Sequence, residues 1–263
     1  PIYCLITLFA DCQSLRIGEW TTHLNYSHIT SVLEADNEIF VGTRSGLYSY
    51  NLTDNSIKTM SKINGISSMH VSALEYSNQM LIIGYADGNI DILKNGETSN
   101  IPDIKNATNI SEKNVNHIYI DENIAYISCS FGLVVLDIEK KEIKETCYFS
   151  TDGVNATVYI SYAFDGEVHR PADSFLANKI FVGTSDGLFY ANKTDNLMNF
   201  MVWQNDSKIS FNKIGSQTFL TSKIPITQMV GYDLKGKGGK SLTIGPKIDY
   251  TQSQFPYFGE TEY

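Results

Sequence analysis

Positive charge is scarce in this sequence. Its 263 residues include 20 Lys and Arg against 29 Asp and Glu, which gives a formal net charge of −9 at pH 7. Proteins that bind nucleic acids or anionic membrane surfaces gain much of their affinity from Lys and Arg side chains that neutralise phosphates. The acidic balance therefore argues against nucleic acid and lipid headgroups as partners. The length suits one domain, or one domain with a small additional piece.

Cysteine and proline are also rare. The 4 cysteines form no Cys-x-x-Cys pair, which excludes zinc ribbons and thioredoxin-like chemistry. Cys4 and Cys12 stand near the start of the chain. Cys129 and Cys147 lie in its body, where the sequence leaves open a disulfide or, more simply, two buried thiols. With 6 prolines and 19 glycines, the chain is neither collagenous nor of low complexity.

Helical periodicity is missing as well. No stretch of twelve or more residues has apolar side chains at helical spacing together with capping residues. The 16 tyrosines and 13 phenylalanines are instead typical of half-buried β-sheet surfaces. The sequence therefore predicts an all-β protein.

The start of the chain is a short apolar run. Residues 2–10 are too few to span a bilayer, and the small residues around Cys12 suit a signal-peptide cleavage site. We therefore predict a truncated signal peptide over residues 1–12 and an exported protein; the alternative is an ordinary buried strand. A lipid-anchored start at Cys12 is disfavoured by the acidic Asp11 before it.

The end of the chain differs in charge from the rest. Residues 206–263 carry 7 lysines and 5 acidic residues, for a net charge of +2, whereas residues 1–205 carry −11. This change in composition predicts a boundary near residue 205. The tail over 206–263 is left unassigned, as further strands or as misplaced sequence.

An internal repeat runs through the body of the chain. Residues 37–51 and 178–192 are nearly the same segment: both read Asn-x-Ile-Phe-Val-Gly-Thr, followed by a turn that ends in Gly and by a second apolar strand. Residues 79–93 and 124–137 keep this hairpin pattern. The glycines at the four turns are Gly46, Gly88, Gly132 and Gly187.

The spacing of the repeat is that of propeller blades. The four turn glycines are 42, 44 and 55 residues apart, and units of about 40–45 residues with four strands each are typical of β-propellers. We expect glycine at these turns because tight hairpins need a positive φ. The repeat predicts propeller blades over residues 13–205. Four repeats are fewer than closed rings of such blades normally use, so the predicted ring is incomplete and the chain a fragment.

The residues of the repeat also resemble a known family. Residues 62–74 and 81–91 are similar to the two-component-regulator type of propeller repeat. More narrowly, Ile-Gly-Glu-Trp at 17–20, Asn-Ile-Pro-Asp-Ile at 100–104 and residues 131–137 resemble the PorZ-like amino-terminal propellers of the Bacteroidetes type IX secretion system. The resemblance covers residues 13–205. Residues 168–173 interrupt the family's pattern, and residues 206–263 do not match it.

The resemblance implies a function as well as a fold. It implies two seven-bladed propellers and a carboxy-terminal β-sandwich, but this chain has no room for the second propeller or for the sandwich. It implies a non-catalytic docking subunit of an outer-membrane attachment complex, exported and found at the cell surface. The implied partners are a sortase-like protease and an outer-membrane β-barrel shuttle protein, with lipopolysaccharide as a further candidate; no cofactor is implied.

Two other functions stay open at this point, and both would need features that we looked for. A sensory propeller of a two-component signalling protein would need a transmembrane helix and kinase domains downstream. A carbohydrate-active propeller enzyme would need clustered carboxylates or aspartate boxes, but Ser185-Asp186-Gly187 does not have the spacing of such a box. Asp87 and Asp186 are therefore interpreted as turn formers.

The remaining candidates for chemistry do not fit their motifs. Residues 236–241 read Gly-Lys-Gly-Gly-Lys-Ser, but Leu234 stands where a phosphate loop needs glycine. Among five scattered histidines, His70 and His117 occupy similar positions on predicted innermost strands, so both could approach a central channel. No carboxylate recurs beside them at metal-ligand spacing. We predict no catalytic residue, no metal site and no cofactor site.

Overall fold

The computed structural model describes residues 24–150, 153–164 and 178–206, and the backbone alone of strands over 209–214, 217–222, 234–235 and 241–242. The predicted signal peptide over 1–12 lies outside the described residues. Nearly all regular structure is antiparallel β-sheet, which confirms the all-β prediction. Among the residues described, two short helices interrupt it: α1 (Asp103–Asn106) and the 3-10 helix η2 (Phe200–Val202).

The first two sheets each contain four strands in chain order. The strands of the first sheet are β1 (Ile29–Ala35), β2 (Glu38–Thr43), β3 (Leu47–Asn51) and β4 (Ile57–Met60). Those of the second sheet are β5 (Val71–Ser77), β6 (Met80–Tyr85), β7 (Ile90–Lys94) and β8 (Glu97–Ile101).

The third and fourth sheets have the same order. Their strands are β9 (Val115–Asp121), β10 (Ile124–Cys129), β11 (Gly132–Asp137) and β12 (Glu142–Cys147), then β13 (Val158–Phe164), β14 (Lys179–Thr184), β15 (Gly187–Asn192) and β16 (Gln204–Asp206). Two hairpins follow: β17 (Ile209–Ile214) with β18 (Gln217–Ser222), and β19 (Leu234–Lys235) with β20 (Ser241–Leu242).

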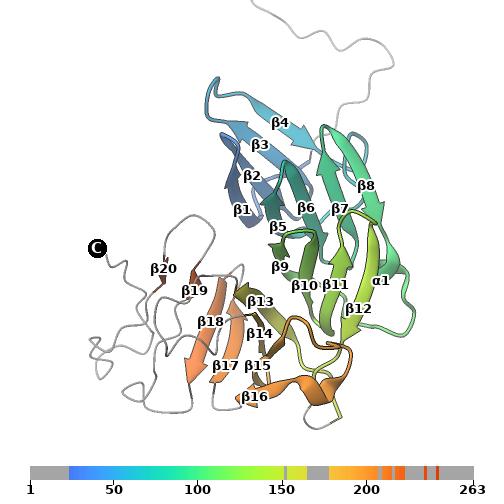
Figure 1. Cartoon of the computed structure of the whole chain (residues 1–263). Coiled ribbons are helices and arrows are strands. Elements are labelled where there is room, and N and C mark those ends of the chain that lie inside the picture. The colour runs from blue at the N-terminus through green and yellow to red at the C-terminus, as the bar shows by residue number, and fades with distance from the viewer. Residues whose placement is uncertain are drawn as a thin grey trace, which may run out of the picture.

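The four sheets are arranged as successive blades of a propeller. Their first strands, β1, β5, β9 and β13, lie next to one another in turn on the inside, and β4, β8 and β12 lie on the outside (Figure 1). This arrangement confirms the predicted propeller with four-stranded blades, of which the described residues form an arc rather than a closed ring.

Neighbouring blades are joined by a contact between a glycine and a valine. A Cβ on Gly42 would lie 2.5 Å from Cγ1 of Val71 in the next blade, and a Cβ on Gly84 would lie 2.4 Å from Cγ1 of Val115. The strands approach so closely here that only the absence of a side chain makes room for the valine. Between the third and fourth blades, Ser128 stands in the position of these glycines and its hydroxyl is 3.0 Å from that of Ser161.

The innermost strand of each blade carries a β-bulge at the same position. The register against the second strand shifts by one residue at each of these four positions, which are Thr30, Ser72, Asn116 and Tyr159. A bulge re-aims the side chain at the extra residue. Thr30 and Asn116 use this freedom to donate a hydrogen bond to the carbonyl of Val71 and of Val158, respectively, in the following blade.

The apolar core lies between blades and not within one sheet. Three clusters of buried side chains fill the spaces between the first and second, second and third, and third and fourth blades. Leu74 and Ile118, which face the preceding blade, are 8% and 1% exposed, whereas the corresponding Val32 of the first blade is 60% exposed. A blade thus needs a neighbour to bury both faces of its sheet.

The turn glycines differ in why they are glycine. Gly88 has φ +81°, a left-handed conformation in which other residues are strained. Gly132 is nearly extended, with φ +159°, but a Cβ there would lie 2.4 Å from the carbonyl oxygen of Cys147. Gly46 and Gly187 lie at the same point of the hairpin, directly before or at the start of the third strand of their blades.

Candidate binding cavity at the inner edge of the blades

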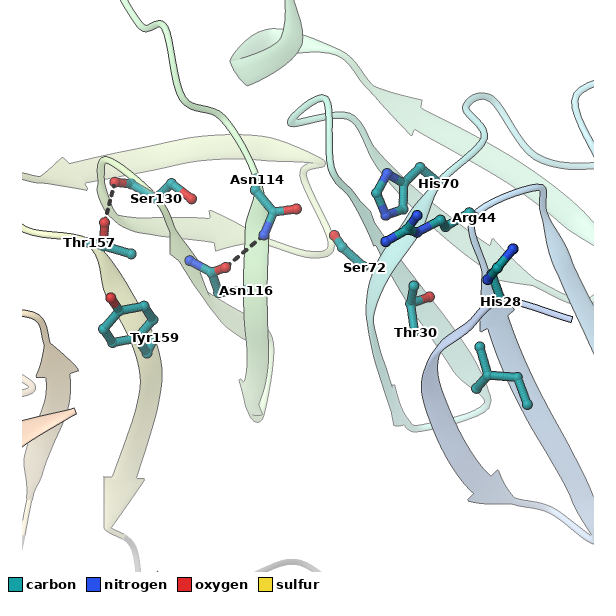
Figure 2. A pocket seen from close by; sticks show the side chains of 11 residues that line it. His28, Thr30, Arg44, His70, Ser72, Asn114, Asn116, Ser130, Thr157 and Tyr159 are labelled. Atoms are coloured by element: carbon teal, nitrogen blue, oxygen red, sulfur yellow. Dashed lines mark hydrogen bonds between the residues drawn. The ribbon is translucent and has the colours of Figure 1, made fainter. Parts of the chain in front are cut away.

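The four blades together form a polar cavity at their inner edge. It has a volume of about 470 Å³ and is lined by 11 residues from all four blades (Figure 2). Cavities of this size commonly hold small molecules or single side chains of a partner. We therefore take it as the candidate functional site.

The repeat itself positions the lining residues. The four bulged residues, Thr30, Ser72, Asn116 and Tyr159, all line the cavity. So do the residues two positions before them, whose carbonyls each accept a backbone hydrogen bond of 3.0–3.1 Å from the turn that follows the second strand of the same blade. These residues are His28, His70, Asn114 and Thr157.

The charge of the cavity is opposite to that of the chain. Arg44, His28 and His70 line it, and none of its 11 lining residues is Asp or Glu, although the chain has 29 of these. Within the described part of the chain, no carboxylate lies at ion-pair distance from the Arg44 guanidinium. A positive group in a pocket without carboxylates creates a local potential that attracts anions.

Arg44 and His70 come from neighbouring blades but share this space. The backbone amide of His70 donates a 3.0 Å hydrogen bond to the carbonyl of Arg44, and Figure 2 shows the Arg44 side chain directed toward His70 and Ser72. Burial lowers the pKa of His70 below its ordinary value of 6.5, and the charge of Arg44 lowers it further. At neutral pH, His70 is therefore an uncharged imidazole beside a charged guanidinium.

The opposite wall of the cavity offers amides and hydroxyls. Asn114 donates to the side-chain oxygen of Asn116 at 2.7 Å, and the Thr157 hydroxyl donates to the Ser130 carbonyl at 3.3 Å (Figure 2). The first bond lies within the third blade, and the second connects the fourth blade to the third. Tyr159 completes this wall.

A second, smaller set of polar groups lies on the other side of His70. A cavity of about 420 Å³ there is lined by Lys62, Ser68, Asp87 and Lys105 among others. Asp87 accepts from the amide of Asn89 at 3.1 Å, as a turn former does, and it pairs with Lys105 at 2.8 Å and with the Ser68 hydroxyl at 2.5 Å. The charges of Asp87 and Lys105 therefore neutralise each other.

The second blade also contains a fully buried carboxylate. Asp91 accepts hydrogen bonds from the Tyr85 hydroxyl at 2.6 Å, from the Ser67 amide at 2.7 Å and from the Asn100 side chain at 2.8 Å. Burial and the neighbouring Asp91 raise the pKa of Tyr85 well above its ordinary value, so the phenol remains a donor. Asp91 therefore joins β6, β8 and the segment before β5 to its own strand β7, away from the residues that line the cavity.

The prediction for the histidines is partly wrong. His70 lines the cavity, but His117 does not. The register shows why: Asn114 occupies the position of His70, whereas His117 stands one residue beyond the bulge and pairs with Ser128. The sequence analysis missed His28 and Arg44, although His28 precedes His70 by 42 residues, the same interval as between Gly46 and Gly88.

Cys129 and Cys147 are free, buried thiols. They lie on β10 and β12, which are separated by β11. Two strand spacings amount to about 9–10 Å, whereas the Cα atoms of a disulfide lie within about 7 Å of each other. Burial raises the pKa of both thiols, that of Cys147 to about 12.

In the described part of the chain, no group of three or more His, Cys, Asp or Glu is arranged to hold a metal ion. The same residues include no helix that is long and apolar enough to cross a membrane.

Four-stranded antiparallel blades that follow one another around a polar cavity define a β-propeller domain. The model of one family, described as the N-terminal β-propeller domain of PorZ of the type IX secretion system, matches residues 39–204. The chain therefore belongs to the PorZ N-terminal β-propeller family.

Solved structures agree with this assignment. PorZ from Porphyromonas gingivalis, described as an essential bacterial surface component of the type IX secretion system, is 22% identical with a TM-score of 0.62, over 86% of this chain and 29% of that protein. The extracellular domain of BT4673 from B. thetaiotaomicron, described as belonging to a one-component system, is 15% identical with a TM-score of 0.54, over 86% of this chain and 33% of its own. At these identities the likeness shows the fold alone. No curated protein matches the sequence.

Proposed function

We propose that this propeller serves as a non-catalytic docking subunit of the type IX secretion system, in an attachment complex at the outer membrane and cell surface. Its family membership over residues 39–204 carries the proposal. The proposed partners are a sortase-like secretion protein and an outer-membrane β-barrel shuttle protein. The protein would be exported to reach them.

The architecture supports docking for a physical reason. Each blade is held by its neighbours through close backbone contacts such as that of Gly84 with Val115, so the loops at the blade ends are presented on a rigid frame. Rigid surfaces bind partners without a large cost in conformational entropy. The inner cavity is lined by hydroxyl, amide and imidazole groups and one arginine, a set that can hold a ligand without reacting with it.

Purification from the native envelope tests this function. The intact protein, tagged at its chromosomal locus, is recovered with a mild detergent after brief chemical cross-linking, and the co-purified proteins are identified by mass spectrometry. We expect a sortase-like protease and an outer-membrane barrel. A tagged, unrelated surface protein at the same expression level is the control. Recovery of neither protein above this control would contradict the proposal.

Lipopolysaccharide is a further proposed ligand and needs its own measurement. In the same preparation, lipopolysaccharide is quantified by immunoblot relative to the control protein after extensive detergent washing. Enrichment that persists when the protein partners are removed by high salt supports direct binding. Enrichment that disappears together with those partners contradicts it.

A sensory role is the second candidate, because the propeller of BT4673 has the same fold over 86% of this chain. It predicts that a histidine kinase or a regulator domain is recovered with the protein, or encoded in the same chain. Loss of the gene would then change transcription of a small set of genes while cargo proteins still reach the surface. The docking role predicts that loss of the gene leaves the cargo proteins inside the cell, without a specific change in transcription.

A further inference from the structure

Arg44 places a guanidinium group at the wall of the inner cavity. Arg44 follows β2, and its backbone is held on both sides: its amide donates to the His28 carbonyl at 3.1 Å and its carbonyl accepts from His70 at 3.0 Å. The main chain at Arg44 is thus held at the cavity wall, while the side chain itself is exposed. No hydrogen bond or ion pair to its guanidinium is found among the described residues.

The surroundings of Arg44 suit an anion that carries one charge. Arg44 is the single arginine or lysine in the cavity lining, and no carboxylate in that lining competes for it. The neighbouring imidazole of His70 is uncharged at neutral pH, as described above. One full positive charge matches a carboxylate better than a phosphate, which carries nearly two negative charges when it is a monoester.

The opposite wall supplies groups that could orient such a ligand. Asn116, Thr157 and Tyr159 are half-buried and line the same cavity from two further blades (Figure 2). Neutral amides and hydroxyls bind the uncharged part of a ligand without adding charge. The cavity therefore combines one ionic contact with several neutral ones, the combination found in specific small-ligand sites.

We propose that the inner cavity binds the carboxylate group of a ligand, with Arg44 as the ionic contact and His28, His70 and the amide and hydroxyl wall around it. This inference goes beyond the docking role and does not depend on which proteins dock. The carboxylate could belong to the end or side chain of a polypeptide or to an acidic sugar, and the experiment separates these two sources.

Saturation-transfer difference NMR on the intact protein tests the proposal, because it detects weak ligands of large proteins. The probes are N-acetylglycine, its uncharged amide, glucuronate and, as the phosphate, methyl phosphate, whose methyl protons can be observed. We expect N-acetylglycine or glucuronate to bind, and the stronger of the two identifies the source. We expect the amide to bind at least about tenfold more weakly, since a charge-assisted hydrogen bond is lost.

Variants connect the binding to Arg44. Arg44→Gln should weaken carboxylate binding at least about tenfold, and Arg44→Lys, which keeps the charge but not the planar fork, should weaken it less. Lys94→Gln is the matched control, because Lys94 is exposed at the far end of β7 and the same charge is removed there. This control should bind as the unaltered protein does.

Several outcomes would overturn the proposal. These are equal binding of the amide and the carboxylate, binding of phosphate but of neither carboxylate, and unchanged binding by Arg44→Gln. If Arg44→Gln does not fold, the comparison of N-acetylglycine with its amide on the unaltered protein still tests whether the cavity recognises a carboxylate. Recovery of secretion partners is measured separately, so the two proposals can fail independently.

Discussion

A Cβ on Gly84 would lie 2.4 Å from Cγ1 of Val115, the first residue of the next blade. The same relationship recurs between Gly42 and Val71. Both valines are fully buried. The glycine of the second strand is therefore fixed by the approach of the neighbouring blade, whereas the hairpin turn plays no part in it.

The Gly84 joint predicts a coupled pair of substitutions. Gly84→Ala should destabilise the protein by about 1–3 kcal/mol, because the added methyl overpacks the joint. Val115→Ala should also be destabilising, but the double variant should lose less than the sum of the two, since the smaller side chain makes room for the methyl. Thermal or denaturant unfolding of the four proteins measures this coupling. Strictly additive effects would show that the two residues do not share one contact.

The buried carboxylate of Asp91 predicts a larger effect. Asp91→Ala should cost about 3 kcal/mol of unfolding free energy, because the Tyr85 hydroxyl, the Ser67 amide and the Asn100 amide lose their acceptor inside the protein. Tyr85→Phe removes one of these three donors and should cost about 1 kcal/mol. Denaturant unfolding compares the two variants. If Asp91→Ala proved no more harmful than Tyr85→Phe, the network would not be the stabilising element described here.

The pairing of Arg44 with His70 predicts a titration. NMR of the His70 imidazole should give a pKa below 6.5, and Arg44→Gln should raise it, since the charge of Arg44 opposes protonation. Asp87 acts in the other direction and limits the shift. Because the unfolded chain binds this proton more tightly, His70 reduces stability as the pH falls below about 6.5. A pKa above 6.5 in the folded protein would contradict the geometry of the cavity.

The two cysteines of the third blade predict chemical inertness. Burial raises the pKa of the Cys147 thiol to about 12 and also raises that of Cys129, so little thiolate exists near neutral pH. Iodoacetamide at pH 8 should modify both residues slowly in the native protein and rapidly after denaturation. Peptide mapping distinguishes them from Cys4 and Cys12. Fast native modification of Cys129 would show that its blade opens readily.

The fold could be predicted from the sequence because its signals are local. The strands follow from apolar runs with glycine turns between them, and the interval between Gly46 and Gly88 gives the size of a blade. The same pattern predicted turns at Gly132 and Gly187, the residues at which β11 and β15 begin in the third and fourth blades. The boundary at residue 205 and the signal peptide over 1–12 stay predictions.

The cavity could not be predicted in the same way, because it depends on the bulges. A bulge re-aims the side chains next to it, and the strand pattern does not mark where it falls. The prediction compared His70 with His117, which are 47 residues apart, whereas the turn glycines of these two blades are 44 residues apart, so Asn114 occupies the position of His70. The positive charge of the cavity could not be predicted from the repeat either. Arg44 lies in a turn where the other blades have Ala86, Ser130 and Ser185, so the repeat pattern gives no reason to single it out.

The second blade contains both halves of the joint, with Val71 to fit the blade before it and Gly84 to receive the blade after it. A tandem copy of this unit would meet its duplicate through the same pair of surfaces and would need no new interface. A ring of such units can therefore gain or lose a member through a single genetic duplication or deletion. Substitutions at positions that face the cavity, such as Arg44, leave these interfaces unchanged. One blade can therefore carry a functional side chain that the other blades lack.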